Sequence, residues 1–240
     1  MSGHSKWNNI AKRKGANDAK KAAIFTKIGR KMAVAIKEGG SNNPDNNAKL
    51  RDCIAEAKAN NVPNDNIKRM LDKGNQSNVS YESNTYEGYG PSGIAVICET
   101  LTDNRNRTVA DVRHYFDKYG AGLGNAGCVS WQFEQKGVLI IERGDLDEDE
   151  TMMTVLDAGA DDFQADEDCF QIYTAPEDFS AVRDALTEAG FEFAQAEIQM
   201  VPQNTITLES QEDMAQLRKL LDSLEDNDDV QNVWHNWDQE

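Results

Sequence analysis

Residues 137–201 carry an order of apolar patterns that few folds accommodate. Short β-branched runs alternate with segments of helical periodicity, and turn residues separate them. The segments are a strand at 138–141, a helix at 149–159, a hairpin at 162–165 and 169–173, a helix at 178–189 and a strand at 191–201. This β-α-β-β-α-β order is typical of the ferredoxin-like fold.

The flanking segments predict a second unit of the same kind, divided by the first. A strand, a helix and a strand are expected across 94–133, and another strand, helix and strand across 205–236. We therefore predict an α+β protein in which one ferredoxin-like domain is inserted in another. The expected domains are a basic helical domain at 1–80, a discontinuous domain at 81–136 with 202–240, and an acidic inserted domain at 137–201.

Charge divides the chain unevenly between its ends. Residues 1–80 hold 16 Lys/Arg and 7 Asp/Glu, whereas residues 81–240 hold 9 and 35, for a net charge of −17. This asymmetry suggests a basic, nucleic-acid-facing head on an acidic body. The alternative for the body is that its acids only keep the protein soluble; that alternative does not explain the head.

A helix is expected from Ala19 to Glu38, with Asp18 as its N-cap and Gly39 at its end. Apolar residues recur every three or four positions along it, and cations gather on the opposite side, although Ala23 and Val34 interrupt them. The cations are Lys20, Lys27, Arg30, Lys31 and Lys37. A core stripe backed by a solvated lysine face is the alternative, but a soluble helix usually mixes both signs.

Upstream of this helix lies a basic arm with one tryptophan. It contains Lys6, Trp7, Lys12, Arg13 and Lys14. Trp7 either docks on the helices or stacks on a base, and docking is favoured because tryptophan buries a large apolar area.

Two further helices complete the expected helical domain. Asn42–Asp45 has the cap and proline of a helix start, and the apolar pattern continues to Asn60. A third helix is expected from Asp65 to Lys73, with Gly74 as its stop.

The middle of the chain is rich in glycine. Thr85–Gly93 is expected to be a turn segment, Asn106–Tyr119 a helix, and Cys128–Phe133 a strand. The loop at Gly120–Gly127 contains a G-x-G-x-x-G, but a dinucleotide site needs a strand before it and a helix after it. Here the order is helix, loop, strand, so we expect a flexible turn.

The search for catalytic and metal-binding motifs favours a non-enzyme without a cofactor. The four cysteines form no C-x-x-C pair, and the sequence has no nucleophile elbow, P-loop or H-E-x-x-H. The acids that begin at Asp145 fail as an EF-hand because Glu150 replaces glycine and Leu156 replaces glutamate. They are expected to form a solvated face or a surface for a basic partner. No apolar run approaches a membrane span, so a cytoplasmic protein is expected.

Several long motifs resemble the YebC/PmpR family. They are Gly3–Trp7, Asp18–Lys20 with Ile24–Lys27, Asn61–Pro63, Tyr86–Pro91, Leu101–Thr108, Val112–His114, and the glycine loop with Val129–Trp131. The resemblance spans the chain and implies a helical domain plus two nested α/β domains. It also implies a DNA-binding transcriptional regulator, with mitochondrial relatives that activate translation. Ala11, Gly15, Ala16 and Ala22–Ala23 stand where the family often carries basic residues, which weakens the arm as a sole contact surface.

The resemblance includes Arg105 and Arg107, which lie where a strand is expected to turn into a helix. Backbone N–H groups at such a turn can receive a phosphate, and the two guanidinium groups would add donors. The alternative is that Asp103 or Asn104 caps the helix and the arginines pair with nearby acids.

The resulting hypothesis is a non-enzymatic, DNA-binding regulator of gene expression. Its alternatives are a translation factor that binds ribosomal RNA, with Trp7 or Tyr86 and Tyr89 for stacking, and a protein scaffold that uses the acidic domain. No membrane or small-molecule partner is expected. The candidate contacts are Lys6, Trp7, Lys12, Arg13, Lys14, Lys20, Lys21, Lys27, Arg30, Lys31, Arg105 and Arg107.

Overall fold

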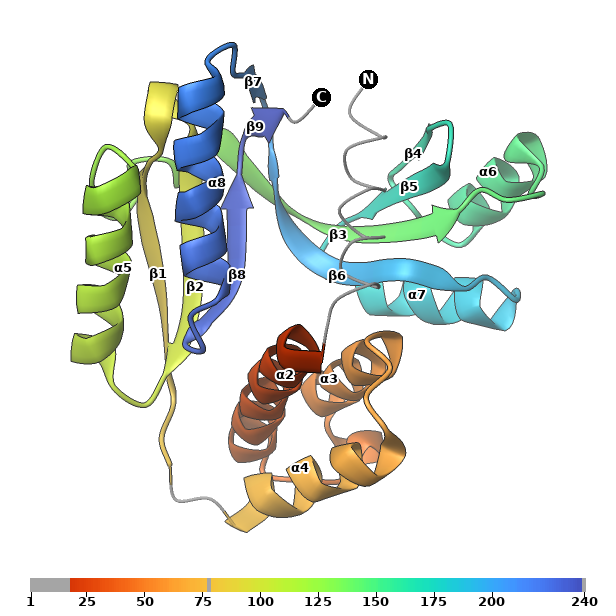
Figure 1. The fold of residues 1–240 in the computed structure, drawn as a ribbon. Coiled ribbons are helices and arrows are strands. Elements are labelled where there is room, and N and C mark those ends of the chain that lie inside the picture. Colours follow the sequence, from red (N-terminus) through yellow and green to blue (C-terminus); the bar gives the residue numbers. More distant parts are fainter. Residues whose placement is uncertain (1–17, 77–78, 239–240) are drawn as a thin grey trace. The chain divides into compact units, whose positions relative to one another are not determined.

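The computed structural model describes residues 18–76 and 79–238, which fall into two compact units. One unit is Gln135–Val201. The other is the described part of Asn17–Glu134 together with Pro202–Asp238. Figure 1 labels the elements of both.

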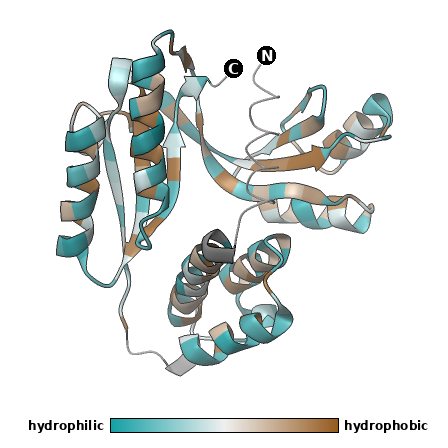
Figure 2. Cartoon of the chain, viewed as in Figure 1, coloured by the Kyte–Doolittle hydropathy of each residue, from teal (hydrophilic) through white to brown (hydrophobic). Residues whose placement is uncertain are grey.

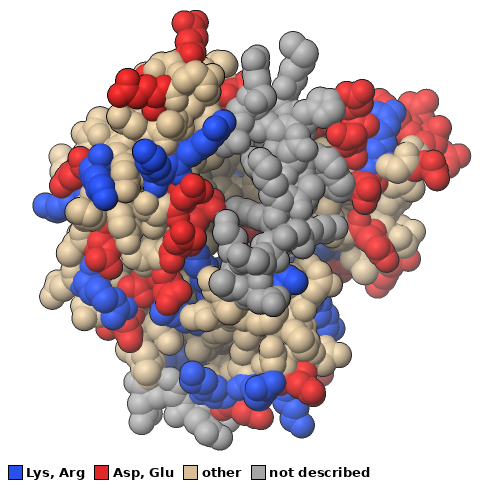
Figure 3. All heavy atoms as spheres, viewed as in Figure 1, with Lys and Arg blue, Asp and Glu red and all other residues tan. Residues whose placement is uncertain are grey.

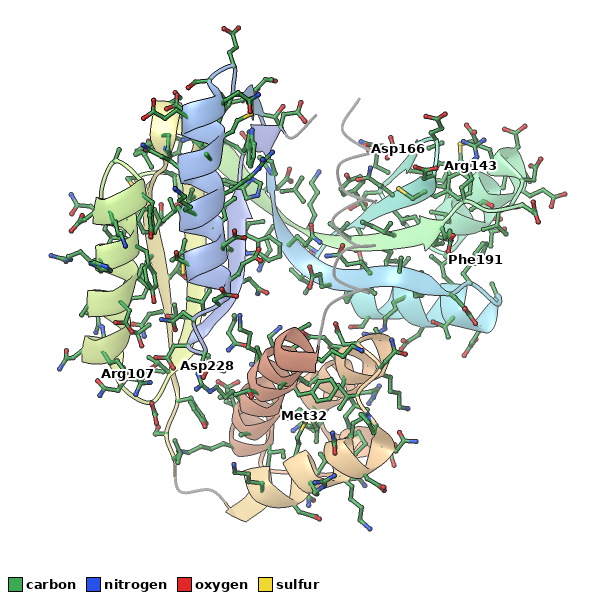
Figure 4. The ribbon with its side chains drawn as sticks, in the orientation of Figure 1. Met32, Arg107, Arg143, Asp166, Phe191 and Asp228 are labelled. Carbon is green, nitrogen blue, oxygen red and sulfur yellow. The ribbon has the colours of Figure 1, made fainter. Side chains whose placement is uncertain are left out.

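Three helices form the first part of the larger unit. They are α2 (Asp18–Gly39), α3 (Ala48–Ala59) and α4 (Asn64–Gln76), with a short 3-10 helix, η1, at Pro44–Asn46. Ile28 and Met32 of α2 are almost fully buried among them, as the predicted stripe of α2 requires, and so is Leu50 of α3. Met32 is labelled on α2 in Figure 4. The helix ends where Gly40 takes a φ of +63°, a backbone conformation that favours glycine.

Two predicted helix boundaries are wrong. Asn43 caps only the 3-10 turn, and the Asn47 side chain caps α3 by accepting from the Leu50 N–H. Gly74 does not end the third helix but lies inside α4. A Cβ at Gly74 would come within 2.8 Å of Ile36, so this glycine allows α4 to pack closely on α2.

The remainder of the larger unit is a sheet in the order β1-β2-β8, with both pairs antiparallel. Helices α5 and α8 pack on this sheet around Val96, Phe116 and Leu217. In Figure 2 both helices carry hydrophilic residues in teal and hydrophobic residues in brown. The elements are β1 (Glu82–Tyr89), η2 (Pro91–Gly93), β2 (Ala95–Thr102), α5 (Arg105–Tyr119), η3 (Ser130–Gln132), β7 (Ile206–Thr207), α8 (Gln211–Glu225), β8 (Val230–His235) and β9 (Trp237–Asp238).

Two predicted segments of this part are wrong. Most of Thr85–Gly93 is not a turn but belongs to β1, whose residues pair with β2 from Glu82 to Tyr89. Cys128–Phe133 is not a strand, since Ser130–Gln132 form a 3-10 helix and β3 begins only at Phe133.

The smaller unit has the predicted β-α-β-β-α-β order. Its sheet order, β4-β5-β3-β6, is that of the ferredoxin-like fold. Leu139, Phe170 and Leu186 belong to its core. The α+β fold class is thus confirmed. The elements are β3 (Phe133–Glu142), α6 (Glu148–Asp157), β4 (Asp162–Ala165), β5 (Cys169–Thr174), α7 (Phe179–Glu188) and β6 (Phe193–Pro202).

Candidate nucleic-acid interface

Six of the twelve candidate contacts cannot be placed by their side chains. Lys6, Trp7, Lys12, Arg13 and Lys14 lie outside the described residues. The backbone of Lys20 belongs to the first turns of α2, but its side chain also falls outside the described part. They remain predictions.

Along α2, several predicted cations already have intramolecular partners. Lys27 donates from Nζ to the carbonyl oxygen of Glu225 at 2.7 Å, which places a cation at the C-terminal end of the α8 dipole. Lys31 pairs with Glu56 of α3 at 2.8 Å. Lys21 is exposed. A phosphate would compete with internal acceptors at Lys27 and Lys31.

Arg30 and Arg107 converge on one buried carboxylate, Asp229, which is only 3% exposed. Arg30 Nη1 lies 2.8 Å from Asp229 Oδ1, and Arg107 Nη2 lies 2.7 Å from Oδ2. The Thr108 hydroxyl donates to Oδ2 at 2.8 Å. Figure 4 shows Arg107 at the start of α5, beside the turn that carries Asp228. This carboxylate therefore joins α2, α5 and the turn before β8.

The surroundings of Asp229 keep it ionised but are unfavourable for a polyanion. Burial alone would raise the pKa of Asp229, but hydrogen bonds from Arg107, Thr108 and Arg30 outweigh it and lower the pKa. The carboxylate lies in an open hollow of about 520 Å³. Five aspartates line that hollow against two arginines: Asp103, Asp111, Asp226, Asp228 and Asp229 against Arg30 and Arg107.

At the N-terminus of α5 the structure shows the expected alternative for Arg107, a capped helix start with the arginine paired to acids. Asn104 caps the helix by accepting from the Arg107 N–H at 3.1 Å. Arg107 also pairs with Asp103 at 2.9 Å, although 47% of its side chain stays exposed. Arg105 is exposed and lowers the pKa of Tyr86, against the larger effect of burial, which raises it. Whether either arginine also contacts a phosphate stays a prediction.

Exposed cations that the candidate set omitted lie on α2, α3 and α4. Within residues 18–76 and 79–238 the structure shows no ion pair for Lys37, Lys58, Lys68 or Lys73. All four side chains are exposed, and Figure 3 shows Lys and Arg gathered over the helical part. The sequence contained the signal, since these lysines fall outside the apolar stripes of their helices.

The glycine loop after α5 is held by a buried glutamate that no sequence pattern singles out. Glu87, on β1, accepts from the backbone N–H groups of Gly127, Val129 and Ser130, each at 2.8 Å. Burial would raise its pKa, but these three hydrogen bonds together lower it. Gly127 has a φ of +84°, which favours glycine at the first of these donors. The predicted flexible turn is thus tied firmly to β1.

One aromatic side chain on this loop is exposed to solvent. Trp131 is 69% exposed, while its indole N–H donates to the Cys128 carbonyl at 3.0 Å. The two tyrosines proposed for stacking are engaged elsewhere. Tyr86 packs against the core, and the Tyr89 hydroxyl donates to the same Cys128 carbonyl.

The described residues lack two further kinds of feature. They contain no group of His, Cys, Asp and Glu side chains suited to a metal ion, and no helix among them is long and apolar enough to cross a membrane. All four cysteines are free thiols.

Comparison with known proteins covers nearly the whole chain. Residues 5–77 match the model of the TACO1/YebC N-terminal domain, and residues 81–237 match that of the TACO1/YebC second and third domains. A protein of Clostridium tetani named probable transcriptional regulatory protein is 57% identical, covering 98% of this chain and 96% of its own. One of Acetivibrio thermocellus with the same name is 55% identical, covering 99% of both.

A solved structure agrees with the fold. The crystal structure of a conserved hypothetical protein from Aquifex aeolicus shares 39% identity and a TM-score of 0.81, covering 92% of this chain and 91% of its own. Two domain models that together span nearly all of the sequence, close relatives of matching length and a shared fold lead to one conclusion: the chain belongs to the TACO1/YebC family.

Proposed function

We propose that this protein is a non-enzymatic, cytoplasmic regulator of gene expression that binds DNA through its helical domain and acts on transcription. The names of its relatives support a role in transcriptional regulation. We also propose that the chain folds as three domains, at 1–80, 81–136 with 202–240, and 137–201.

The observation that carries the proposal is the separation of charge between the helical domain and the rest. The first 80 residues have 16 basic and 7 acidic side chains in a chain of net charge −17. Lys37, Lys58, Lys68 and Lys73 are exposed on three helices. Such cations attract a phosphate backbone and provide affinity without sequence preference.

A charge-matched pair of variants tests this interface. In the first, Lys58, Lys68 and Lys73 become alanine; in the control, Arg113, Lys118 and Lys219, exposed on α5 and α8, become alanine. Binding to duplex DNA is measured over a range of salt. In the first variant the slope of log affinity against log salt concentration should fall by the equivalent of up to about three phosphate contacts. Its affinity should fall more than about tenfold, while the control variant should bind nearly as wild type does.

A third variant, with Lys6, Lys12, Arg13 and Lys14 replaced by alanine, measures the contribution of the arm. Salt-independent binding, or equal losses in the test and control variants, would contradict an interface on the helical domain.

A second candidate function is regulation of translation through ribosomal RNA. The specific observation in its favour is the exposed indole of Trp131, because unpaired bases are common in folded RNA and rare in duplex DNA. Co-sedimentation with ribosomes on a sucrose gradient tests it. Recovery of the protein only in the ribosome-free fractions would eliminate this candidate.

A further inference from the structure

We propose that Trp131 is a preformed stacking platform for one unpaired nucleobase. The inference deepens the proposed nucleic-acid binding by naming a contact outside the helical domain, and it rests on that function. Trp131 is 69% exposed, so it lacks the large apolar burial by which a tryptophan usually stabilises a fold.

The position of the indole is fixed from both sides of the chain. Before it, the Val129 and Ser130 N–H groups are bound by the Glu87 carboxylate. After it, the Gln132 carbonyl accepts from the Gln203 N–H at 2.8 Å. A ring on such a support loses little conformational entropy when a ligand arrives.

The polar edge of the indole is already used within the protein. Its Nε1–H donates to the Cys128 carbonyl, which also accepts from Tyr89. Hydrogen bonding is therefore not what the exposed ring offers to a partner. What remains is the π-face, which stacks on a base of any identity.

The surroundings of Trp131 fit a single flat ring better than a protein surface. Among the described residues of its own unit, the only other large, exposed apolar side chain is Val79, far earlier in the sequence. A protein interface would need a contiguous apolar centre around the tryptophan. The neighbours of Trp131 in sequence are instead the half-buried Ser130 and Gln132.

The loop also lacks the charge that would repel a nucleic acid. Residues 119–133 contain no Asp, Glu, Lys or Arg, in a chain that is 28% charged. The Glu87 carboxylate beneath the loop is only 7% exposed and faces three backbone N–H dipoles. A base can therefore approach the ring without bringing its phosphate against an exposed carboxylate of this loop.

Fluorescence anisotropy with matched oligonucleotides tests the proposal on the full-length protein. The probes are labelled oligouridine of about twelve nucleotides, the same strand with abasic central nucleotides, the DNA strand of the same length, and a DNA duplex. Trp131→Ala should weaken binding of the intact single strands about 5- to 150-fold, and Trp131→Phe should retain most of the affinity. Both variants should bind the abasic strand as wild type does.

Each other outcome has a definite meaning. If the wild type binds intact and abasic strands equally, or Trp131→Ala loses nothing, no base stacks on Trp131 and the inference is wrong. If the wild type binds only the duplex, the inference is wrong while the proposed function stands. If it binds none of the four probes, both are wrong. Comparison of the RNA and DNA strands shows which nucleic acid supplies the base.

Discussion

Asp229 and Glu87 are both buried carboxylates with lowered pKa values, and the protein stabilises their charges in different ways. Asp229 is bound by two guanidinium groups and a hydroxyl. Within the described residues, Glu87 is bound by three backbone N–H groups and by no cation. The first arrangement uses two arginines to join distant segments. The second shapes one loop, and residues 119–133 of that region carry no charged side chain.

The largest effect is expected at the cation-bound site. Asp229→Ala leaves Arg30 and Arg107 facing each other without their carboxylate, and it should lower the free energy of unfolding by about 2–4 kcal/mol. Urea unfolding measures it. Asp228→Ala removes the same charge from an exposed neighbour and serves as the control. Equal losses in the two variants would show that Asp229 acts only through net charge.

A smaller loss is expected at the site bound by backbone groups. Glu87→Gln turns one acceptor oxygen into an N–H₂ group that faces a backbone donor, which should cost about 1–3 kcal/mol. Hydrogen exchange at Gly127, Val129 and Ser130 should accelerate, because their acceptor is weakened. Glu82→Gln on the same strand is exposed and should change neither quantity. Unchanged exchange at the three amides would mean that Glu87 does not fix the loop.

Acid should weaken both sites, because each pKa is lower in the folded protein than in the unfolded chain. Their contributions are therefore complete above about pH 5 and are lost as the pH falls below about 4, through the folded pKa values. Glu87→Gln and Asp229→Asn should each flatten the acid side of the stability profile, and Glu82→Gln should not. A profile of unchanged steepness in both variants would contradict the assignment.

The smallest effect is expected on the salt dependence of nucleic-acid binding, and it should differ between the two sites. Asp229→Asn weakens the attachment of two arginines and should steepen the salt dependence of binding by up to about one contact for each arginine that reaches a phosphate. Glu87→Gln releases no cation and should leave the slope unchanged. Identical slopes in wild type and Asp229→Asn would remove Arg30 and Arg107 from the candidate contacts.

The sequence was sufficient for elements whose cause is local. The stripe of α2 and the strand and helix order of the smaller unit follow from periodicity, caps and turn residues. The errors arose where a distant group decides the outcome. Val129 and Ser130 have strand-like neighbours, but their N–H groups are taken by Glu87, more than forty residues earlier. Gly88 and Gly90 suggest a turn, yet Gly88 pairs with Val96 in β1, and it is a glycine because a Cβ there would meet Phe116 at 2.7 Å.

The candidate interface was predictable in its charge but not in its contacts. The excess of lysine in the helical domain is visible in the sequence. The partner of Arg30 is 199 residues away, and nothing near Arg30 indicates it. The uncharged run at 119–133 could have indicated Trp131. The exposure of its indole, however, depends on a fold that buries Val129 and leaves the side chain of Trp131 in solvent.

The position of Asp229 in the sequence also sets an order of events during synthesis. A ribosome makes Arg30 and Arg107 long before Asp229, which follows Arg107 by 122 residues. The helices of the N-terminal part can form as they emerge, while the sheet that contains β8 must wait for the returning segment. Until then, both guanidinium groups lack their buried carboxylate. A nascent chain is therefore more cationic at this face than the finished protein, and it gains Asp226, Asp228 and Asp229 last.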